Sequence, residues 1–136
     1  MSGYVSVLAV GGVAGLTVGI LLRVLNNRPR RQIRRAREDF QQIVRRRLSS
    51  AEVTTWGGKE VHPVFWIKTG NDEERDQLST DSSLTEDFRT ALLQADYPAV
   101  DVPLAQYVVE SQETVDRDYA GSWVKRRSDW YRHRYN

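Results

Sequence analysis

Few residues in this chain of 136 could carry catalytic or metal chemistry. The absence of cysteine excludes disulfides, thiolate metal ligands and a cysteine nucleophile. The two histidines, His62 and His133, lie far apart and lack the spacing of a metal site. No serine stands in a context that pairs it with a histidine. We therefore expect no metal, no cofactor and no enzymatic activity.

Two other motifs could suggest ligand binding. The acidic residues Asp72, Glu73, Glu74 and Asp76 lack the D-x-D-x-D-G order of an EF-hand loop. We expect them to be solvated or to meet basic partners. The sequence GGVAG at 11–15 lies within an apolar stretch instead of between a strand and a helix, which argues against a phosphate-binding loop.

Charge is distributed in blocks along the chain. Residues 1–50 carry ten arginines and two acidic residues, a net charge of +8. Residues 51–118 carry five basic and fifteen acidic residues, and residues 119–136 carry five basic residues and one acidic residue. Such blocks indicate parts with different surroundings. We predict a spanning helix at 1–25, a basic amphipathic helix at 26–50, an acidic extramembrane domain and a basic aromatic tail.

The most apolar stretch runs from Tyr4 to Leu22 and has nineteen positions without a charge. At about 1.5 Å per residue, this length nearly matches a hydrocarbon core of roughly 30 Å. A cleaved signal peptide would have basic residues before the apolar run, and a buried helix of a globular fold is a further alternative. The predicted fold class is a single-span membrane protein with a small α+β or irregular acidic part outside the membrane.

Three glycines in this stretch are spaced four residues apart, at Gly11, Gly15 and Gly19. Residues at this spacing share one face of a helix, and the double GxxxG pattern forms a shallow groove there. Glycine is also simply common in spanning helices. We expect the groove to pack against a neighbouring helix.

Beyond a bend or helix restart marked by Pro29, apolar residues recur at helical spacing and predict an amphipathic helix. They are Ile33, Ala36, Phe40, Ile43 or Val44, and Leu48. The polar face holds nine arginines: Arg28, Arg30, Arg31, Arg34, Arg35, Arg37, Arg45, Arg46 and Arg47. We expect these to contact anionic lipids such as cardiolipin, or an acidic partner subunit. Nucleic acid is disfavoured, because the arginines begin at the predicted edge of the bilayer.

The acidic part contains signals for both strands and helices. Gly57 and Gly58 separate two runs of β-prone residues, which is typical of a hairpin. Residues 70–83 are predicted to form a polar loop, residues 84–97 a helix, and residues 105–110 a strand. The helix should direct Leu84, Phe88 and Leu92 towards a core. These elements either form a small α+β unit or drape over a partner.

The basic tail is rich in aromatic residues. Its predicted interface anchors are Trp123, Trp130, Tyr131 and Tyr135. Aromatic residues combined with arginine are typical of protein interfaces. The same composition suits a membrane surface or stacking on single-stranded nucleic acid. We favour contact with protein or with lipid headgroups.

The first 52 residues contain a pattern of short motifs: SGY at 2–4, a glycine-containing apolar stretch, a run of arginines, and EDF at 38–40. This pattern resembles the retinoid–interferon-induced mortality factor family, whose members are single-span accessory subunits of mitochondrial complex I, the proton-pumping NADH:ubiquinone oxidoreductase. The resemblance implies an accessory role without cofactor or chemistry. It also implies a downstream part in the intermembrane space, whereas the arginines favour the opposite side.

These observations together predict a non-catalytic structural accessory subunit of a respiratory complex in the mitochondrial inner membrane. Its partners would be other membrane subunits of that complex, which it would help to assemble and stabilise. The alternative is a bacterial or phage protein-binding module anchored in the bacterial inner membrane by a single span.

Overall fold

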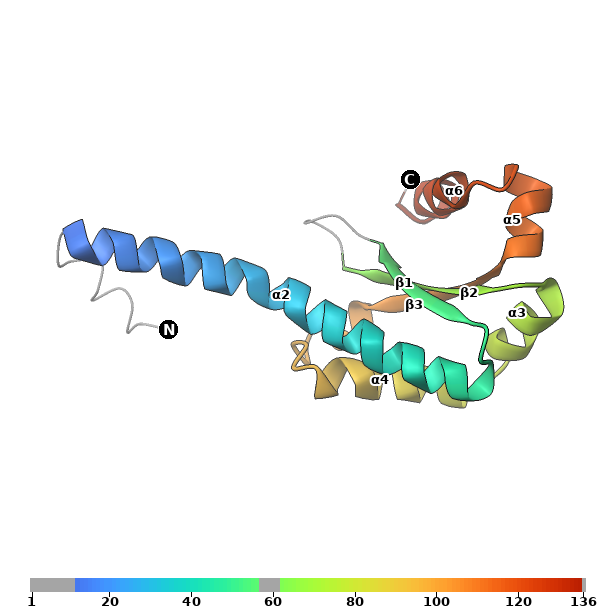
Figure 1. Cartoon of the computed structure of the whole chain (residues 1–136), viewed down its shortest axis with the longest axis horizontal. Helices are drawn as coiled ribbons and strands as arrows, with labels where there is room; N and C mark the ends of the chain where they lie inside the picture. The colour runs from blue at the N-terminus through green and yellow to red at the C-terminus, as the bar shows by residue number, and fades with distance from the viewer. Residues whose placement is uncertain (1–11, 57–61, 136) are drawn as a thin grey trace.

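The computed structural model describes residues 12–56 and 62–135, and for 12–29 and 135 it describes the backbone alone. It is a three-stranded sheet with helices on both faces (Figure 1). The elements in chain order are α2 (Gly12–Arg47), β1 (Glu52–Trp56), β2 (Val64–Thr69), α3 (Asp72–Ser79), α4 (Ser83–Gln94), the 3-10 turn η1 (Val102–Leu104), β3 (Gln106–Ser111), α5 (Gln112–Tyr119) and α6 (Trp123–Tyr135).

The sheet has the strand order β1-β2-β3, with β2 in the centre. β1 runs antiparallel to β2, so that Val53 lies opposite Ile67, whereas β3 runs parallel to β2. Helices α2 and α4 cover one face of the sheet, and α6 lies over the other (Figure 1). Four successive residues of β2, from Val64 to Ile67, are buried because this strand is covered on both faces.

The core on the α2 side is built around the ring of Phe40. Its ring centroid lies 6.3 Å from that of Phe65 in β2, 5.0 Å from that of Phe88 in α4 and 5.7 Å from that of Tyr107 in β3. These separations fall in the range that favours edge-to-face aromatic packing. One buried ring therefore joins α2 to the sheet and to α4.

The predicted apolar stripe of the amphipathic helix is confirmed. Its fully buried members are Ala36, Phe40 and Val44, and Ile33, Ile43 and Leu48 pack partly buried against the core. The predicted core positions Leu84, Phe88 and Leu92 of α4 are also buried. These positions follow the 3.6-residue period, which is why the sequence alone identified them.

The predicted single-span fold class is wrong. Within 12–56 and 62–135, no helix combines the length and the hydropathy that crossing a bilayer requires. Of the apolar stretch, α2 contains the described positions 12–22, and it continues without a break into the charged run that begins at Arg23. The same helix then runs through Pro29 without the expected restart, and its second half packs in the core of an α+β fold.

The predicted polar loop at 70–83 is wrong at 72–79, where α3 forms. Asn71 caps this helix by accepting a hydrogen bond of 2.8 Å from the backbone N–H of Glu74. The acidic residues in the first turn interact favourably with the helix dipole, and Leu78 is the one buried side chain of α3. A helix this short and polar has no apolar stripe by which its sequence could have indicated it.

Arg47, expected to contact lipid or a partner, instead fastens the end of α2 to the start of α4. Its guanidinium donates hydrogen bonds of 2.7 Å to Asp81, 2.5 Å to Asp87 and 2.9 Å to the Ser83 hydroxyl. Less than a quarter of the Arg47 side chain is exposed. The guanidinium of Arg47 thus joins α2 to the start of α4, two elements that are far apart in the sequence.

Replacing Arg47 should lower the stability of the fold. We expect Arg47→Ala to lower the free energy of unfolding by about 1–2 kcal/mol, because two carboxylates lose a partly buried, charge-assisted partner. The matched variant is Arg46→Ala, on the exposed side of the same helix, with an expected change below about 0.5 kcal/mol. Urea denaturation of both variants measures the difference, and equal losses would contradict a specific role for Arg47.

Candidate functional site

The arginines of α2 lie on the side of the helix that faces away from the core. Ala36, Phe40 and Val44 face the sheet, and the helical period places the exposed arginines on the remaining faces. These are Arg30, Arg31, Arg34, Arg35, Arg45 and Arg46. Because the stripe is buried in the core, the direction of these side chains is set by the fold itself.

Most of these arginines make weak contacts, or none, with carboxylates of the same chain. Arg35 lies 3.9 Å from a carboxylate oxygen of Asp96, and Arg37 lies 3.8 Å from one of Glu38, with solvent-exposed partners in both cases. Exposed pairs of this kind contribute little. In the described ranges, no carboxylate lies within 4.0 Å of Arg31 or Arg46. Arg45 Nε donates a hydrogen bond of 3.1 Å to the Ala51 carbonyl, so part of this face is used within the chain, and Arg31 and Arg46 are among the arginines that no described carboxylate pairs.

For several predicted site residues the structure gives no side-chain contacts. Gly11 lies outside the described residues. Gly15 and Gly19 lie on α2 one turn apart, and Arg28 and Tyr135 are described by backbone alone. Packing of another helix on the glycine face stays a prediction.

The aromatic residues of the tail contact the body of the chain itself. The Trp130 ring lies edge-on to Trp66 with centroids 5.9 Å apart, and the Lys68 ammonium lies 4.8 Å from the Trp123 ring centroid. The Tyr131 hydroxyl donates a hydrogen bond of 3.3 Å to a backbone carbonyl of β1. These three side chains were predicted as anchors for a partner, and in the structure they pack α6 against the sheet.

The interface between α6 and the sheet is unusually polar. The guanidinium of Arg126 lies 5.4 Å from the Trp66 ring, and that of Arg127 lies 4.3 Å from the Trp56 ring. Among the described residues, three buried atoms at this interface have no hydrogen-bond partner: Thr54 Oγ1, Trp66 Nε1 and Arg127 Nε. Burial lowers the pKa of Arg127. This interface therefore combines cation–aromatic contacts with buried polar atoms, unlike the apolar core under α2.

Asp72 is the centre of a network at the end of the sheet where α3 and α5 begin. It accepts hydrogen bonds from the Ser111 hydroxyl, from the Thr114 hydroxyl at 2.6 Å and from Arg117 at 3.0 Å. These donors, the Ser111 hydroxyl first, hold the pKa of Asp72 far below its ordinary value. The carboxylate therefore joins two helices that are remote in the sequence.

Glu110 extends this network to α6. Its side chain is 5% exposed and accepts a hydrogen bond of 2.7 Å from Arg126, while Arg75 of α3 lies 3.4 Å away. Burying a carboxylate is unfavourable unless it is paired and hydrogen-bonded in this way. Since these carboxylates meet arginines of the same chain, we assign the network a structural role.

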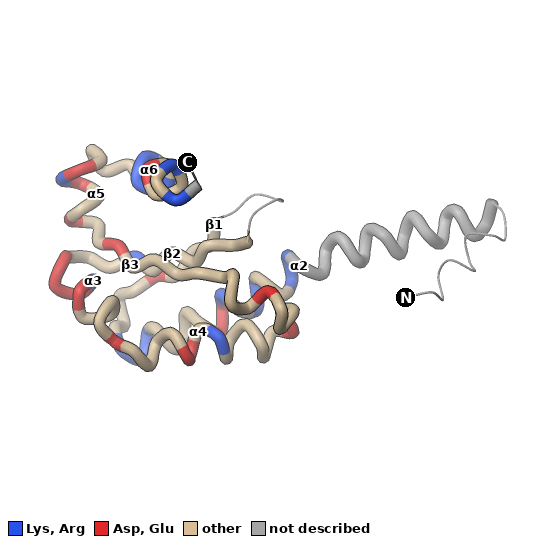
Figure 2. The backbone as a smooth tube through the Cα atoms, turned by 180° about the vertical axis from the view of Figure 1, so that it is seen from behind, with Lys and Arg blue, Asp and Glu red and all other residues tan. Residues whose placement is uncertain are grey.

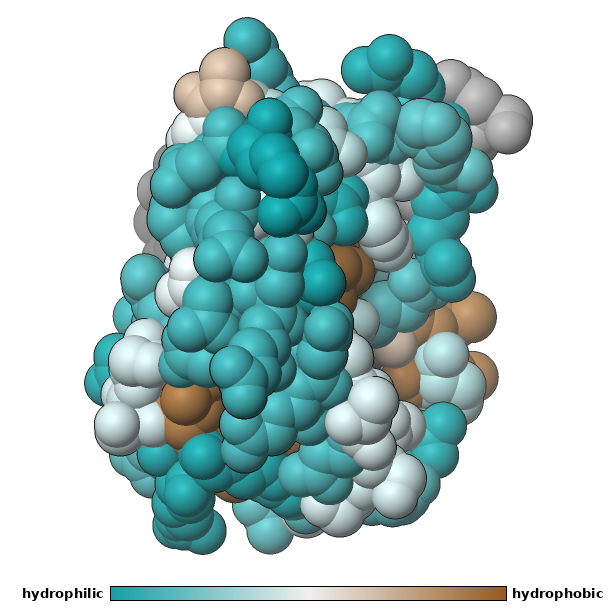
Figure 3. All heavy atoms as spheres, turned by 90° about the vertical axis from the view of Figure 1, so that its right-hand side faces the viewer, coloured by the Kyte–Doolittle hydropathy of each residue, from teal (hydrophilic) through white to brown (hydrophobic). Residues whose placement is uncertain are grey.

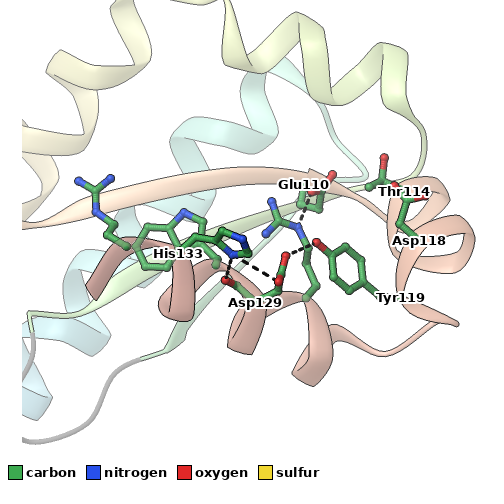
Figure 4. Close-up of a pocket in the computed structure, with 9 residues that line it drawn as sticks. Glu110, Thr114, Asp118, Tyr119, Asp129 and His133 are labelled. Carbon is green, nitrogen blue, oxygen red and sulfur yellow. Dashed lines mark hydrogen bonds and ion pairs between the residues drawn. The ribbon is translucent and has the colours of Figure 1, made fainter. Parts of the chain in front are cut away.

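A hollow of about 470 Å³ lies between α5 and α6 (Figure 4). In it the Tyr119 hydroxyl donates a hydrogen bond of 2.7 Å to Asp129, and His133 Nδ1 lies 2.8 Å from the backbone carbonyl of Asp129. The hydrogen bond raises the pKa of Tyr119 and lowers that of Asp129. Tyr119 therefore stays protonated at neutral pH, which does not suit a general base. Asp129 and His133 are four residues apart and lie on the same face of α6. This contact was not predicted from the sequence, because no helix was predicted in the tail.

Acidic and basic residues occur on different elements of the surface. Acidic residues are frequent on α3 and α5, and the described arginines lie along α2, whose C-terminal end lies near α3 (Figure 2). The face at the α3 and α5 end is mainly hydrophilic (Figure 3). In the parts of the chain that the structure describes, no three His, Cys, Asp or Glu side chains are placed to hold a metal ion. The arginine face of α2 is thus the candidate site.

The shifted pKa of Asp72 predicts a loss of stability in acid. The unfolded state takes up a proton near pH 4, before the folded state does, so the stabilisation is complete above about pH 4 and is lost as the pH falls below it. Asp72→Asn should be less stable than the wild type at pH 7 and should lose less on acidification. Denaturant unfolding between about pH 5 and pH 2 measures both slopes, and identical slopes would contradict the assignment.

Comparison with protein-family models, with curated proteins and with solved structures gives no match to this chain. The resemblance of the first 52 residues to a family of respiratory accessory subunits therefore stays a prediction.

Proposed function

We propose that this protein is a non-catalytic binding subunit, which joins a larger assembly by docking the arginine face of α2 on an acidic protein surface. The observation that carries this proposal is the exposure of Arg31, Arg35 and Arg46, on the side of α2 opposite the buried residues Ala36, Phe40 and Val44. Guanidinium groups bind carboxylates through two parallel hydrogen bonds, and a helix anchored in a core holds them at fixed spacing.

The pattern of charge along α2 supports a protein partner over a phosphate-rich one. Glu38 and Asp39 are both exposed and lie between the arginines at 34–35 and those at 45–46. The two arginine groups are separated by about ten residues, roughly 15 Å along the helix. A continuous surface of phosphates would meet these two carboxylates with like charge, whereas a folded protein can present complementary charges at each position.

The proposal is tested by reversing charge on the arginine face. In cells of the source organism, a tagged wild-type chain should migrate on a native gel in an assembly far larger than 15.7 kDa. Arg31→Glu combined with Arg35→Glu should shift the chain to the size of the isolated subunit, because repulsion replaces attraction at the interface. Antibodies to complex I subunits on the same gel determine whether that assembly is the one implied by the resemblance.

The control carries the same charge change on α6, at the exposed residues Lys125 and Arg132, both replaced by glutamate. It should remain in the assembly. Equal release of both double variants, or a wild-type chain that migrates alone, would contradict the proposal. Sedimentation with cardiolipin vesicles that depends on Arg31 and Arg35, without any protein partner, would assign the face to lipid headgroups instead.

A further inference from the structure

β3 lies at an edge of the sheet, and one side of its backbone is open to pairing. Among the described strands, β2 is its one neighbour. Within 12–56 and 62–135, no backbone–backbone hydrogen bond outside the sheet involves residues 106–109. At the far end of the strand, Glu110 and Ser111 are buried, so the open part of the edge is 106–109. An edge of this kind is a template for pairing with another strand.

The exposure of β3 differs from that of β2 at the same register. Residues 64–67 of β2 lie opposite residues 106–109 of β3, and both runs lie between the helical layers of α4 and α6 (Figure 1). The four residues of β2 are buried, whereas all four of β3 are half-buried. Solvent therefore reaches β3 along its open edge.

A hollow of about 460 Å³ lies beside this edge, between β3 and α4. Tyr107 and Val109 of β3, which pack against the core, line it together with Phe88 of α4 and Val102 of η1. These side chains offer aromatic and aliphatic surface next to the open backbone of the strand. The hollow therefore suits an apolar side chain.

The hollow between α5 and α6 adjoins the same edge on the opposite face of the sheet. Glu110 lines it and points to α6, where it accepts a hydrogen bond of 2.7 Å from Arg126 (Figure 4). Arg134 lines both hollows. Successive side chains of a strand point to opposite faces of its sheet. A strand added beside β3 would therefore direct its side chains alternately towards the two hollows.

The charges at this edge favour an acidic segment. Arg134 is exposed, and so is Arg89, which lines the hollow beside α4 and has a solvent-exposed partner in Glu86 at 2.8 Å. Asp118 also lines the hollow between α5 and α6, and it lies 3.3 Å from Arg117. Each hollow thus has an exposed guanidinium that attracts a carboxylate.

We propose that the edge of β3 at 106–109 binds an extended acidic segment of a partner protein as a fourth strand of the sheet. Backbone hydrogen bonds to β3 supply the affinity, and side-chain contacts supply the specificity. Apolar side chains of the segment occupy the hollow beside Phe88, and a carboxylate meets Arg134. A second copy of β3 has no carboxylate at 106–109 to offer these arginines. This surface and the arginine face of α2 can fail independently.

Titration of the full chain with a capped peptide, followed through its amide resonances, tests this surface. The peptide has about seven residues of alternating glutamate and valine, the length of an ordinary strand. It should bind saturably with a Kd below about 1 mM, and the shifts should be concentrated at 106–109. A peptide with lysine in place of glutamate should bind about tenfold more weakly, because its ammonium groups repel Arg89 and Arg134.

N-methylated peptides distinguish strand addition from attraction between charges alone. In an extended strand, the N–H groups of alternate residues point to the same edge. One peptide carries N-methyl groups on every glutamate, and a second carries them on every valine. One of the two should retain its affinity within about twofold, and the other should lose binding because it lacks the donors that pair with β3. Equal affinity of the two peptides would overturn the proposal.

Two variants of α6 with the same charge change locate the site. Arg134→Glu should weaken binding of the glutamate–valine peptide by about tenfold or more, since repulsion replaces a charge-assisted contact. Arg132→Glu, at an exposed position on another side of the helix, should change it by less than about twofold. Equal loss in both variants, or no saturable binding, would contradict the proposal. Self-association of the chain that the peptide reverses would assign the edge to a second copy and would equally overturn it.

Discussion

The burial of Phe40 is the constraint on which the rest of the structure depends. Its ring is fully buried at the point where α2, the sheet and α4 meet, and it contacts aromatic rings from three other elements. Because this ring and its neighbours Ala36 and Val44 face the core, the helical period places the arginines on the other faces of α2. The hydrophobic stripe thus determines where the charges of α2 point.

The two faces of the sheet are held by different kinds of interaction. Under α2 and α4 the contacts are apolar and aromatic, whereas under α6 they consist of guanidinium groups over tryptophan rings and a carboxylate network through Glu110. In the parts of the chain that the structure describes, Trp66 Nε1 and Arg127 Nε in this layer have no hydrogen-bond partner. Trp123, Trp130 and Tyr131 of the tail contact the sheet, so these side chains contribute to the fold of the chain itself.

Periodicity made the second half of α2 and the core face of α4 predictable from the sequence, because their buried positions repeat with the 3.6-residue period of a helix. The same reasoning failed where structure depends on contacts remote in the sequence. Asp72 meets Ser111 and Arg117 across about 40 residues, which no local pattern indicates. The predicted span and the predicted basic helix belong to one helix, α2, whose second half packs in the core, and the apolar length of 4–22 does not indicate that packing.

Amide hydrogen exchange along α2 tests most directly whether the core fixes the arginine-bearing helix. If Phe40 anchors it as described, amides at 36–47 should exchange as slowly as those of the central strand at 65–67, through global unfolding alone. Exchange at 36–47 that is orders of magnitude faster than in β2, under conditions where β2 remains protected, would contradict a fixed arginine face.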